Sequence, residues 1–158
     1  MSRYIYGVDP GTTKSGVAYF DTENNRVVWS SGDMPNADVL GWIRRYRDQD
    51  DTDIAIERIA AIYGGVVGGE TVRTIQFCGR VIEAAQPKVI RCLSPQEIRQ
   101  AICGTAKAKD PGVTQALLDK IGPKGTKKNP GPTFGVASHA WRGLAAAYAS
   151  TLVPTHPE

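Results

Sequence analysis

Apolar and polar residues alternate along the first part of the chain in three short runs separated by turn residues. The runs cover residues 4–8, 15–21 and 26–30, with Asp9-Pro10-Gly11 after the first and Asn24-Asn25 before the third. A period of two residues bounded by such turns is typical of strands joined by hairpins. The pattern predicts an antiparallel meander of three strands.

The spacing then becomes helical, with apolar residues at Val39, Leu40, Ile43 and Tyr46. Pro35 and Asn36 precede this segment as helix start signals. The next run, Ile54-Ala55-Ile56, has no alternation and ends at Glu57. Continuous apolar residues are typical of a strand that is buried on both faces, so we predict a central strand with Glu57 at its carboxyl end.

Four more helices and one more strand are predicted downstream. Glycines at 64–65 and 68–69 precede a long helix, for which Val72, Ile75, Gly79 and Ile82 indicate the buried face. Pro87 ends this helix, and residues 88–93 read as a strand. Ser94-Pro95-Gln96-Glu97 caps a short helix that continues through Ile102. After a helix over 111–121 and a loop over 122–132, a last helix covers about 136–152, with Ala140, Gly143, Leu144 and Ala147 facing the sheet.

This order of elements predicts the α/β class, with a mixed central sheet and helices on both faces. The chain has 158 residues, of which 41% are hydrophobic and 22% charged. These values suit one globular domain over residues 1–158 without structural metals or disulfides. The longest apolar run is too short to span a membrane, so we expect a cytoplasmic protein with no membrane partner, from a bacterial cell or an infected host cell. The three cysteines form no Cys-x-x-Cys pair and are expected to be reduced and buried.

Positive charge is concentrated late in the chain. The net charge is only +3, but one stretch between Gly104 and Gly131 holds Lys107, Lys109, Lys120, Lys124, Lys127 and Lys128. Such a stretch favours a phosphate-binding face, and a solvated lysine-rich loop explains it about equally well when it is read alone.

Three polar residues are candidates for chemistry. Asp9 and Glu57 follow two strands that this topology places side by side, and His139 lies at the start of the last helix. Ligands collect beyond the carboxyl ends of such strands, and carboxylates suit Mg²⁺ or Mn²⁺. Taken singly, Asp9 before Pro-Gly also reads as a turn residue and His139 as a helix cap. The joint placement favours a metal site.

Motifs along nearly the whole chain resemble those of the RuvC-type Holliday-junction resolvases. They are Gly7-Val8-Asp9-Pro10-Gly11 with Gly16-Val17-Ala18, then Ile56-Glu57-Arg58, then Glu97-Ile98-Arg99-Gln100 with Gly104 and Lys109. The Pro-Gly-Pro-Thr-Phe-Gly and Ser-His-Ala-Trp stretch before the last helix is similar to phage-encoded relatives. The resemblance implies a ribonuclease-H-like fold and a homodimeric endonuclease that cuts four-way DNA junctions, leaving 5′-phosphate and 3′-hydroxyl ends.

The resemblance also implies roles for individual residues. Asp9 would bridge two Mg²⁺ ions, with Mn²⁺ as a substitute, while Glu57 completes one site and His139 the other. Arg99 and Lys109 match basic residues near the scissile phosphate, where Lys109 would assist catalysis. The family's base-stacking aromatic has Ala60 at its place, with Tyr63 as a substitute one turn on. Further DNA contacts are expected from Lys107, Lys124, Lys127 and Lys128.

One position departs from the family. Where a fourth acid is expected, three residues after His139, this chain has Arg142. A guanidinium cannot ligate a metal. We therefore expect Arg142 either to contact a DNA phosphate or to swing away, and the second metal site to be weaker in both cases.

Two other functions remain open from the residues. The segment from Asp9 to Gly16 also resembles the phosphate loop of actin-like ATPases and sugar kinases, but the two domains and later loops of those proteins are missing here. Arg142 also allows a branched-DNA-binding protein that has lost hydrolysis.

Overall fold

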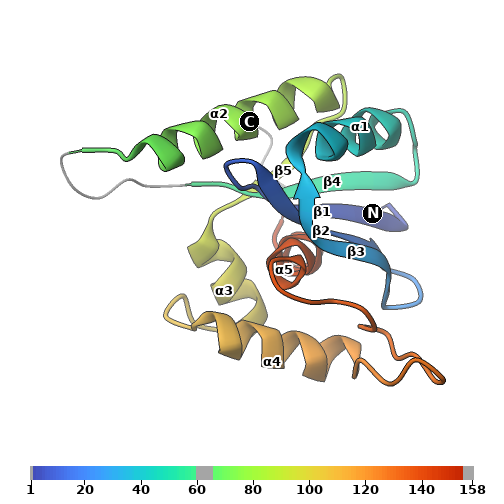
Figure 1. The fold of residues 1–158 in the computed structure, drawn as a ribbon. Helices are drawn as coiled ribbons and strands as arrows, with labels where there is room; N and C mark the ends of the chain where they lie inside the picture. The colour runs from blue at the N-terminus through green and yellow to red at the C-terminus, as the bar shows by residue number, and fades with distance from the viewer. Residues whose placement is uncertain (1, 60–65, 155–158) are drawn as a thin grey trace.

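One five-stranded sheet forms the centre of the computed structural model, which describes residues 2–59 and 66–154. The sheet order is β3-β2-β1-β4-β5 (Figure 1). Strands β1 (Tyr4–Asp9), β2 (Lys14–Asp21) and β3 (Arg26–Pro35) form the predicted antiparallel meander. Strands β4 (Thr52–Glu57) and β5 (Arg91–Leu93) add in parallel beside β1.

Helices cover both faces of this sheet, as the sequence predicts. Helices α1 (Asn36–Arg47) and α2 (Gly69–Ala85) lie on one face, and α3 (Pro95–Cys103), α4 (Asp110–Ile121) and α5 (Ala140–Ser150) lie on the other (Figure 1). Because side chains of a strand alternate between faces, Ile5 packs with the α3–α5 face while Tyr6 and Val8 pack with the α1–α2 face. The α/β class and the mixed sheet are confirmed.

Helix α5 approaches the sheet unusually closely because glycines line the contact. A Cβ atom built on Gly7 of β1 would lie 2.1 Å from the carbonyl oxygen of Gly143, and one on Gly16 of β2 would lie 2.1 Å from the carbonyl oxygen of His139. A larger residue at either position would push the helix away. The glycines therefore bring the beginning of α5, with His139, against the carboxyl end of β1 and the beginning of β2.

The buried face of α2 differs from the prediction. The residues that pack inward are Phe77, Val81, Ala84 and Ala85, whereas Val72, Ile75 and Ile82 are each about 40% exposed (41%, 40% and 41%) and Gly79 is also exposed. Both stripes have helical spacing, so the local pattern favours neither. Packing of α2 against α1 decides the orientation and leaves an apolar stripe on the outside.

Three element boundaries differ from the predicted ones by three residues or more. Strand β3 continues five residues past the predicted end at Ser30, to Pro35. Strand β5 begins at Arg91 rather than at Lys88, because the Lys88 N–H donates to the Ala85 carbonyl in a turn that follows α2, and Val89 beyond it is exposed. Helix α5 begins at Ala140 rather than near 136, since Ser138 has a left-handed backbone (φ 53°) that interrupts a helix.

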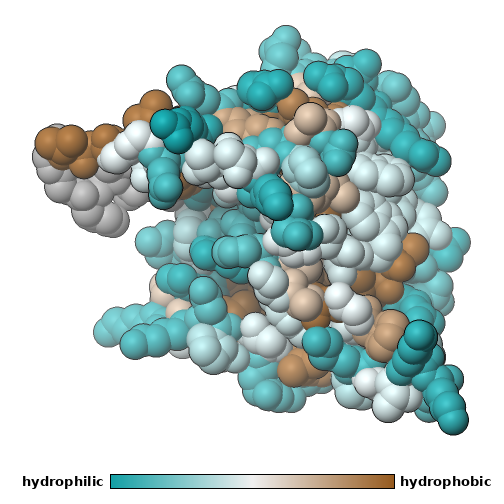
Figure 2. All heavy atoms as spheres, in the orientation of Figure 1, coloured by the Kyte–Doolittle hydropathy of each residue, from teal (hydrophilic) through white to brown (hydrophobic). Residues whose placement is uncertain are grey.

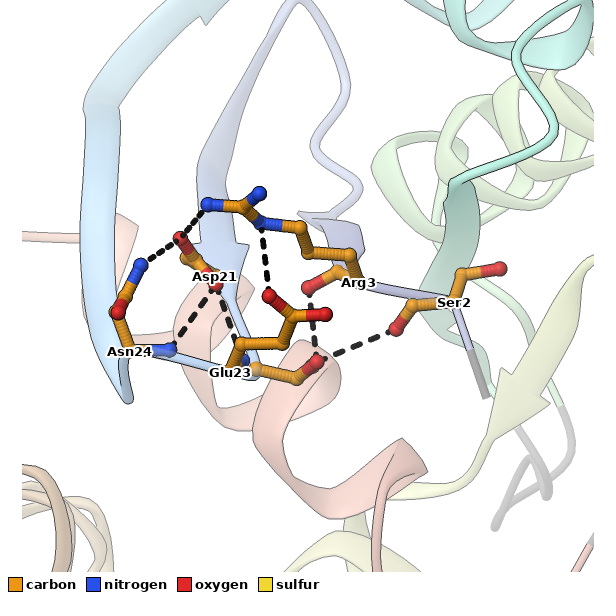
Figure 3. A network of polar contacts seen from close by, with 6 residues as sticks. Ser2, Arg3, Asp21, Glu23 and Asn24 are labelled. Atoms are coloured by element: carbon orange, nitrogen blue, oxygen red, sulfur yellow. Dashed lines mark hydrogen bonds and ion pairs between the residues drawn. The ribbon is translucent and has the colours of Figure 1, made fainter.

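A polar network ties the opposite end of the meander together, at the start of β1 and the end of β2 (Figure 3). Asp21 accepts hydrogen bonds from the backbone N–H groups of Glu23 (3.0 Å) and Asn24 (3.1 Å), from the Asn24 amide (2.8 Å) and from Arg3 (3.3 Å). Arg3 also pairs with Glu23. The buried Asp21 carboxylate is thereby fully supplied with donors.

The cysteines agree with the expectation only in part. Cys78, Cys92 and Cys103 form no disulfide, but they are half-buried rather than buried. None of the helices in the described part of the chain combines the length and the apolar composition of a membrane span.

Candidate active site

Asp9 and Glu57 end two neighbouring parallel strands. Val8 of β1 and Ile56 of β4 are partners in the sheet register, so the next residue of each strand is a carboxylate at the same edge. Ile5 and Ala55 face α5, and because strands alternate, Asp9 and Glu57 project to that face too. The side chains are only 14% and 12% exposed. The predicted juxtaposition of these two acids is confirmed.

The loop after Asp9 is held by an internal hydrogen-bond network. The buried Ser15 hydroxyl accepts from the Gly11 N–H (3.1 Å) and donates to Asn36 Oδ1 (2.7 Å), and Asn36 Nδ2 donates to the Gly11 carbonyl (3.0 Å). The Thr12 hydroxyl donates to the Glu70 carbonyl. These hydroxyls attach the loop to α1 and α2. Because they are already hydrogen-bonded within the protein, the geometry argues against their binding nucleotide phosphates as in the actin-like ATPases.

The beginning of α5 supplies two more side chains to this edge. His139 Nδ1 lies 3.5 Å from Asp9 Oδ2. The Arg142 guanidinium donates from Nη2 to Glu57 Oε1 at 2.7 Å, and its Nε lies 3.9 Å from Asp9 Oδ2. Arg142 thus lies between the two acids. Of the two expectations for Arg142, the one in which its side chain swings away from the site is therefore wrong, and contact with a DNA phosphate stays a prediction.

Burial dominates the electrostatics of both acids. Loss of water raises the pKa of Asp9, and the nearby Arg142 and His139 offset this only in part. Burial likewise raises the pKa of Glu57, and the charge of Asp9 adds to the rise although Arg142 opposes it. Two carboxylates that are short of donors and share one buried edge favour a cation between them. Arg142 is the cation present.

The three predicted metal ligands do not form a compact set here. In residues 2–59 and 66–154, no group of three or more Asp, Glu, His or Cys side chains is arranged to hold a metal ion. His139 is 65% exposed and its Nδ1 lies 3.5 Å from Asp9 alone of the two acids, while the Arg142 guanidinium lies between them. The metal site therefore stays a prediction. The sequence did not indicate that Arg142 contacts both acids.

A cavity of about 340 Å³ opens directly beside the acids. Its polar lining comes from Glu57, His139 and Arg142, from Arg99 with its partner Asp110, and from Thr114 and Ser138. The apolar lining consists of Pro95, Ile98, Val113, Trp141 and Ala145. Trp141 also carries the Lys124 ammonium over its ring at 5.9 Å. The cavity can receive a group that is partly flat and partly anionic, such as a nucleotide.

The predicted DNA-binding residues divide into two groups. Arg99, Lys107 and Lys109 line one shallow basic groove next to the cavity, where Arg99 also pairs with Asp110 at 3.6 Å. Lys124, Lys127 and Lys128 lie beyond the other end of α4, a helix about 18 Å long. That loop contacts the β2–β3 hairpin, because the Val27 N–H donates to the Pro132 carbonyl (Figure 1). Tyr63 lies outside the described residues.

Known proteins to which this chain is similar in sequence and in structure carry the same name. No family model matches the chain. Two curated relatives are named crossover junction endodeoxyribonuclease RuvC: that of Pseudarthrobacter chlorophenolicus is 27% identical over 98% of this chain and 88% of the relative, and that of Paenarthrobacter aurescens is 28% identical over 98% and 92%.

Solved structures agree on the fold. Thermus thermophilus RuvC in complex with a Holliday junction substrate superposes with a TM-score of 0.68 at 19% identity, covering 95% of this chain and 93% of that one. A second T. thermophilus RuvC structure gives a TM-score of 0.65, also at 19% identity, over 94% and 93%. The predicted ribonuclease-H-like fold is confirmed, and so is the resemblance indicated by the motifs.

Proposed function

We propose that this chain is a RuvC-type resolvase, a structure-selective DNA endonuclease that cuts four-way junctions by metal-dependent phosphodiester hydrolysis. The observation that carries the proposal is the pair of nearly buried carboxylates, Asp9 and Glu57, at the adjoining ends of β1 and β4. The pair occurs in a chain that is similar to RuvC proteins over nearly its full length.

The residues present fit one hard divalent cation. Asp9 and Glu57 offer carboxylate oxygens, which Mg²⁺ prefers, and His139 adds an imidazole that favours Mn²⁺ as the substitute. When bound, such a cation polarises the scissile phosphate and stabilises the charge that builds up during hydrolysis. Arg142 is the residue that does not fit a second, four-ligand site, because it carries a positive charge where an acid would be needed.

The chain's own residues then have distinct tasks. Asp9 and Glu57 would hold the cation, and the contact with Asp9 orients the His139 imidazole. Arg99, Lys107 and Lys109 lie in the groove beside the cavity and bind the phosphates that flank the cut. Lys109 also assists catalysis, because its charge neutralises the charge that builds up on the scissile phosphate. The apolar wall around Trp141 excludes water from one side of the reacting group.

The exposed stripe of α2 supports a homodimer. Val72, Ile75, Gly79 and Ile82 follow one another at helical spacing on the outer surface. Figure 2 shows hydrophobic residues interspersed with hydrophilic ones on the side of the molecule where α2 lies. Resolving a junction requires two related cuts, which two copies of one chain related by a two-fold axis supply. We assign this stripe to the contact between the two copies.

Junction cleavage tests the proposed activity. Purified protein is incubated with labelled four-way junctions in Mg²⁺, in Mn²⁺ and in EDTA, with a linear duplex of the same sequence as control. We expect paired nicks near the branch point that require the divalent cation, and little cleavage of the duplex. Binding of the junction without cleavage in either metal would favour a DNA-binding protein that has lost hydrolysis.

The dimer has its own test. Ile75→Glu places a charge in the exposed stripe and should convert a dimer into a monomer in light scattering, with the helix content unchanged. Val28→Glu is the matched control, because Val28 is an exposed apolar residue (52%) on β3, away from α2. A wild-type chain that is monomeric at high concentration would contradict the assignment.

A further inference from the structure

The strongest unexplained feature is the position of the Arg142 guanidinium. It lies between two nearly buried carboxylates, 2.7 Å from Glu57 Oε1 and, through Nε, 3.9 Å from Asp9 Oδ2. The Arg142 side chain is itself only 35% exposed. A fixed positive charge therefore occupies the place at which a divalent cation would bridge the same two acids.

A guanidinium and a divalent cation compete for this place for two reasons. Both use the carboxylate oxygens of Asp9 and Glu57, and the two positive charges repel at short range in a site with little water. A cation can reach full contact with Glu57 only when Arg142 gives up its hydrogen bond to Oε1. Arg142 thus lowers the affinity of the DNA-free protein for the cation.

The backbone offers Arg142 no way to withdraw. Its neighbour Gly143 packs tightly on the sheet: a Cβ atom built on it would lie only 3.0–3.1 Å from backbone atoms of Gly7, Gly16 and Val17, so α5 has little room to move. Only the flexible side chain can move. The cavity beside it, lined by Arg99, Ser138 and Trp141, is open to an incoming phosphate. A guanidinium binds phosphate through two parallel hydrogen bonds, so DNA offers it an alternative partner.

We infer that Arg142 is a displaceable internal cation that holds the Asp9–Glu57 pair until DNA arrives, and that a DNA phosphate draws it away and thereby raises the affinity of the pair for a divalent cation. The inference rests on the proposed function, since it assumes that DNA and a divalent cation meet at this site. It makes cation binding and DNA binding mutually reinforcing through one side chain.

The test measures cation binding without cleavage. Mn²⁺ is titrated into DNA-free protein and followed by its electron paramagnetic resonance signal, for wild type, Arg142→Gln and Arg142→Lys. Arg142→Gln should bind Mn²⁺ roughly ten-fold more tightly or better, because a like charge has been removed. Arg142→Lys keeps the charge and should stay within a few-fold of wild type. Arg44→Gln is the matched control, since Arg44 is an exposed arginine of α1, on the opposite face of the sheet.

The titration is repeated with a short linear duplex, which supplies phosphates without a junction to cut. The duplex should raise the Mn²⁺ affinity of wild type several-fold and that of Arg142→Gln much less. Thermal unfolding in EDTA verifies that each variant is folded, and Arg142→Met, which also removes the positive charge, replaces Arg142→Gln if that variant does not fold. Equal Mn²⁺ affinity in wild type and Arg142→Gln, or an equal response to the duplex, would overturn the inference. Junction cleavage by wild type would still stand in that case, so the two proposals fail separately.

Discussion

Asp9 and Asp21 lie at opposite ends of the same pair of strands, and both are nearly buried, yet their surroundings differ. Tyr4 pairs with Asp21 at one end of the β1–β2 ladder, and Asp9 pairs with Gly16 at the other. Burial alone would raise the pKa of Asp21, but hydrogen bonds from Asn24 and Arg3 outweigh it and lower the pKa. Burial raises the pKa of Asp9, and no comparable set of donors reverses it.

The difference separates a carboxylate that supports the fold from one that is available for chemistry. Asp21 has its donors from neighbouring backbone and side chains, so it is complete without a ligand. Asp9 and Glu57 depend on one guanidinium, that of Arg142, and one exposed imidazole, that of His139. A buried charge that the protein leaves poorly paired is a common sign of a functional site.

The largest effect expected from breaking this contrast is on cleavage. Asp9→Asn and Glu57→Gln should each reduce junction cleavage by about 100-fold or more, because even residues that only support metal ligands change activity by about 10- to 100-fold. Junction binding, measured by fluorescence anisotropy in EDTA, should change little, because it depends on phosphate neutralisation. Asp21→Asn is the matched control and should keep its cleavage rate at temperatures at which it is folded. Wild-type turnover in Asp9→Asn would remove Asp9 from the site.

The next largest effect is on stability: replacing Asp by Asn should change the free energy of unfolding in opposite directions at Asp9 and at Asp21. Burial raises the pKa of Asp9 in the folded state. Such a carboxyl group stabilises the fold fully only below its unfolded pKa of about 3.9, and this contribution is lost as the pH rises through the folded pKa. Ionised Asp9 therefore opposes folding at pH 7. Asp9→Asn should therefore increase the free energy of unfolding at pH 7 in EDTA.

For Asp21 the sign is reversed, because its lowered pKa contributes stability above the unfolded value and loses it as pH falls through the folded one. Asp21→Asn should reduce the free energy of unfolding at pH 7 by about 1–3 kcal/mol, since hydrogen bonds to a buried charge are lost. Urea denaturation at pH 4 to 8 measures both, with the exposed Asp50→Asn as a near-neutral control. Equal signs for Asp9→Asn and Asp21→Asn would contradict the contrast.

The smallest expected effect distinguishes the two groups of lysines at the ends of α4. Lys109→Ala should reduce cleavage more than binding, because Lys109 lies in the groove next to the cavity that Glu57 lines. Replacing Lys124, Lys127 and Lys128 together should instead weaken binding and reduce the slope of log affinity against log salt by about one unit for each phosphate that is no longer neutralised. Arg44→Ala with Arg45→Ala, on the opposite face of the sheet, is the control. If the triple variant keeps the wild-type slope of log affinity against log salt, the loop that carries Lys124, Lys127 and Lys128 does not contact DNA and is only solvated.

The sequence by itself determined the meander, the central strand and the placement of both acids. Strand periodicity and turn residues are local signals, and two carboxylates that end adjacent parallel strands must meet at one edge of the sheet. The capping box at Ser94 and Glu97 is likewise local, and both of its hydrogen bonds are present.

Tertiary structure alone decided the features that depend on competition between distant groups. Helix α2 has two apolar stripes, and only its packing on α1 selects Phe77 and Val81 for the core and leaves Ile75 outside. Arg142 has a long side chain whose direction no periodicity sets, and it turns to the acids because their buried charges attract it more strongly than solvent does. Local pattern can place a backbone position, but the partner that a flexible charge chooses follows from what the whole fold brings within its reach.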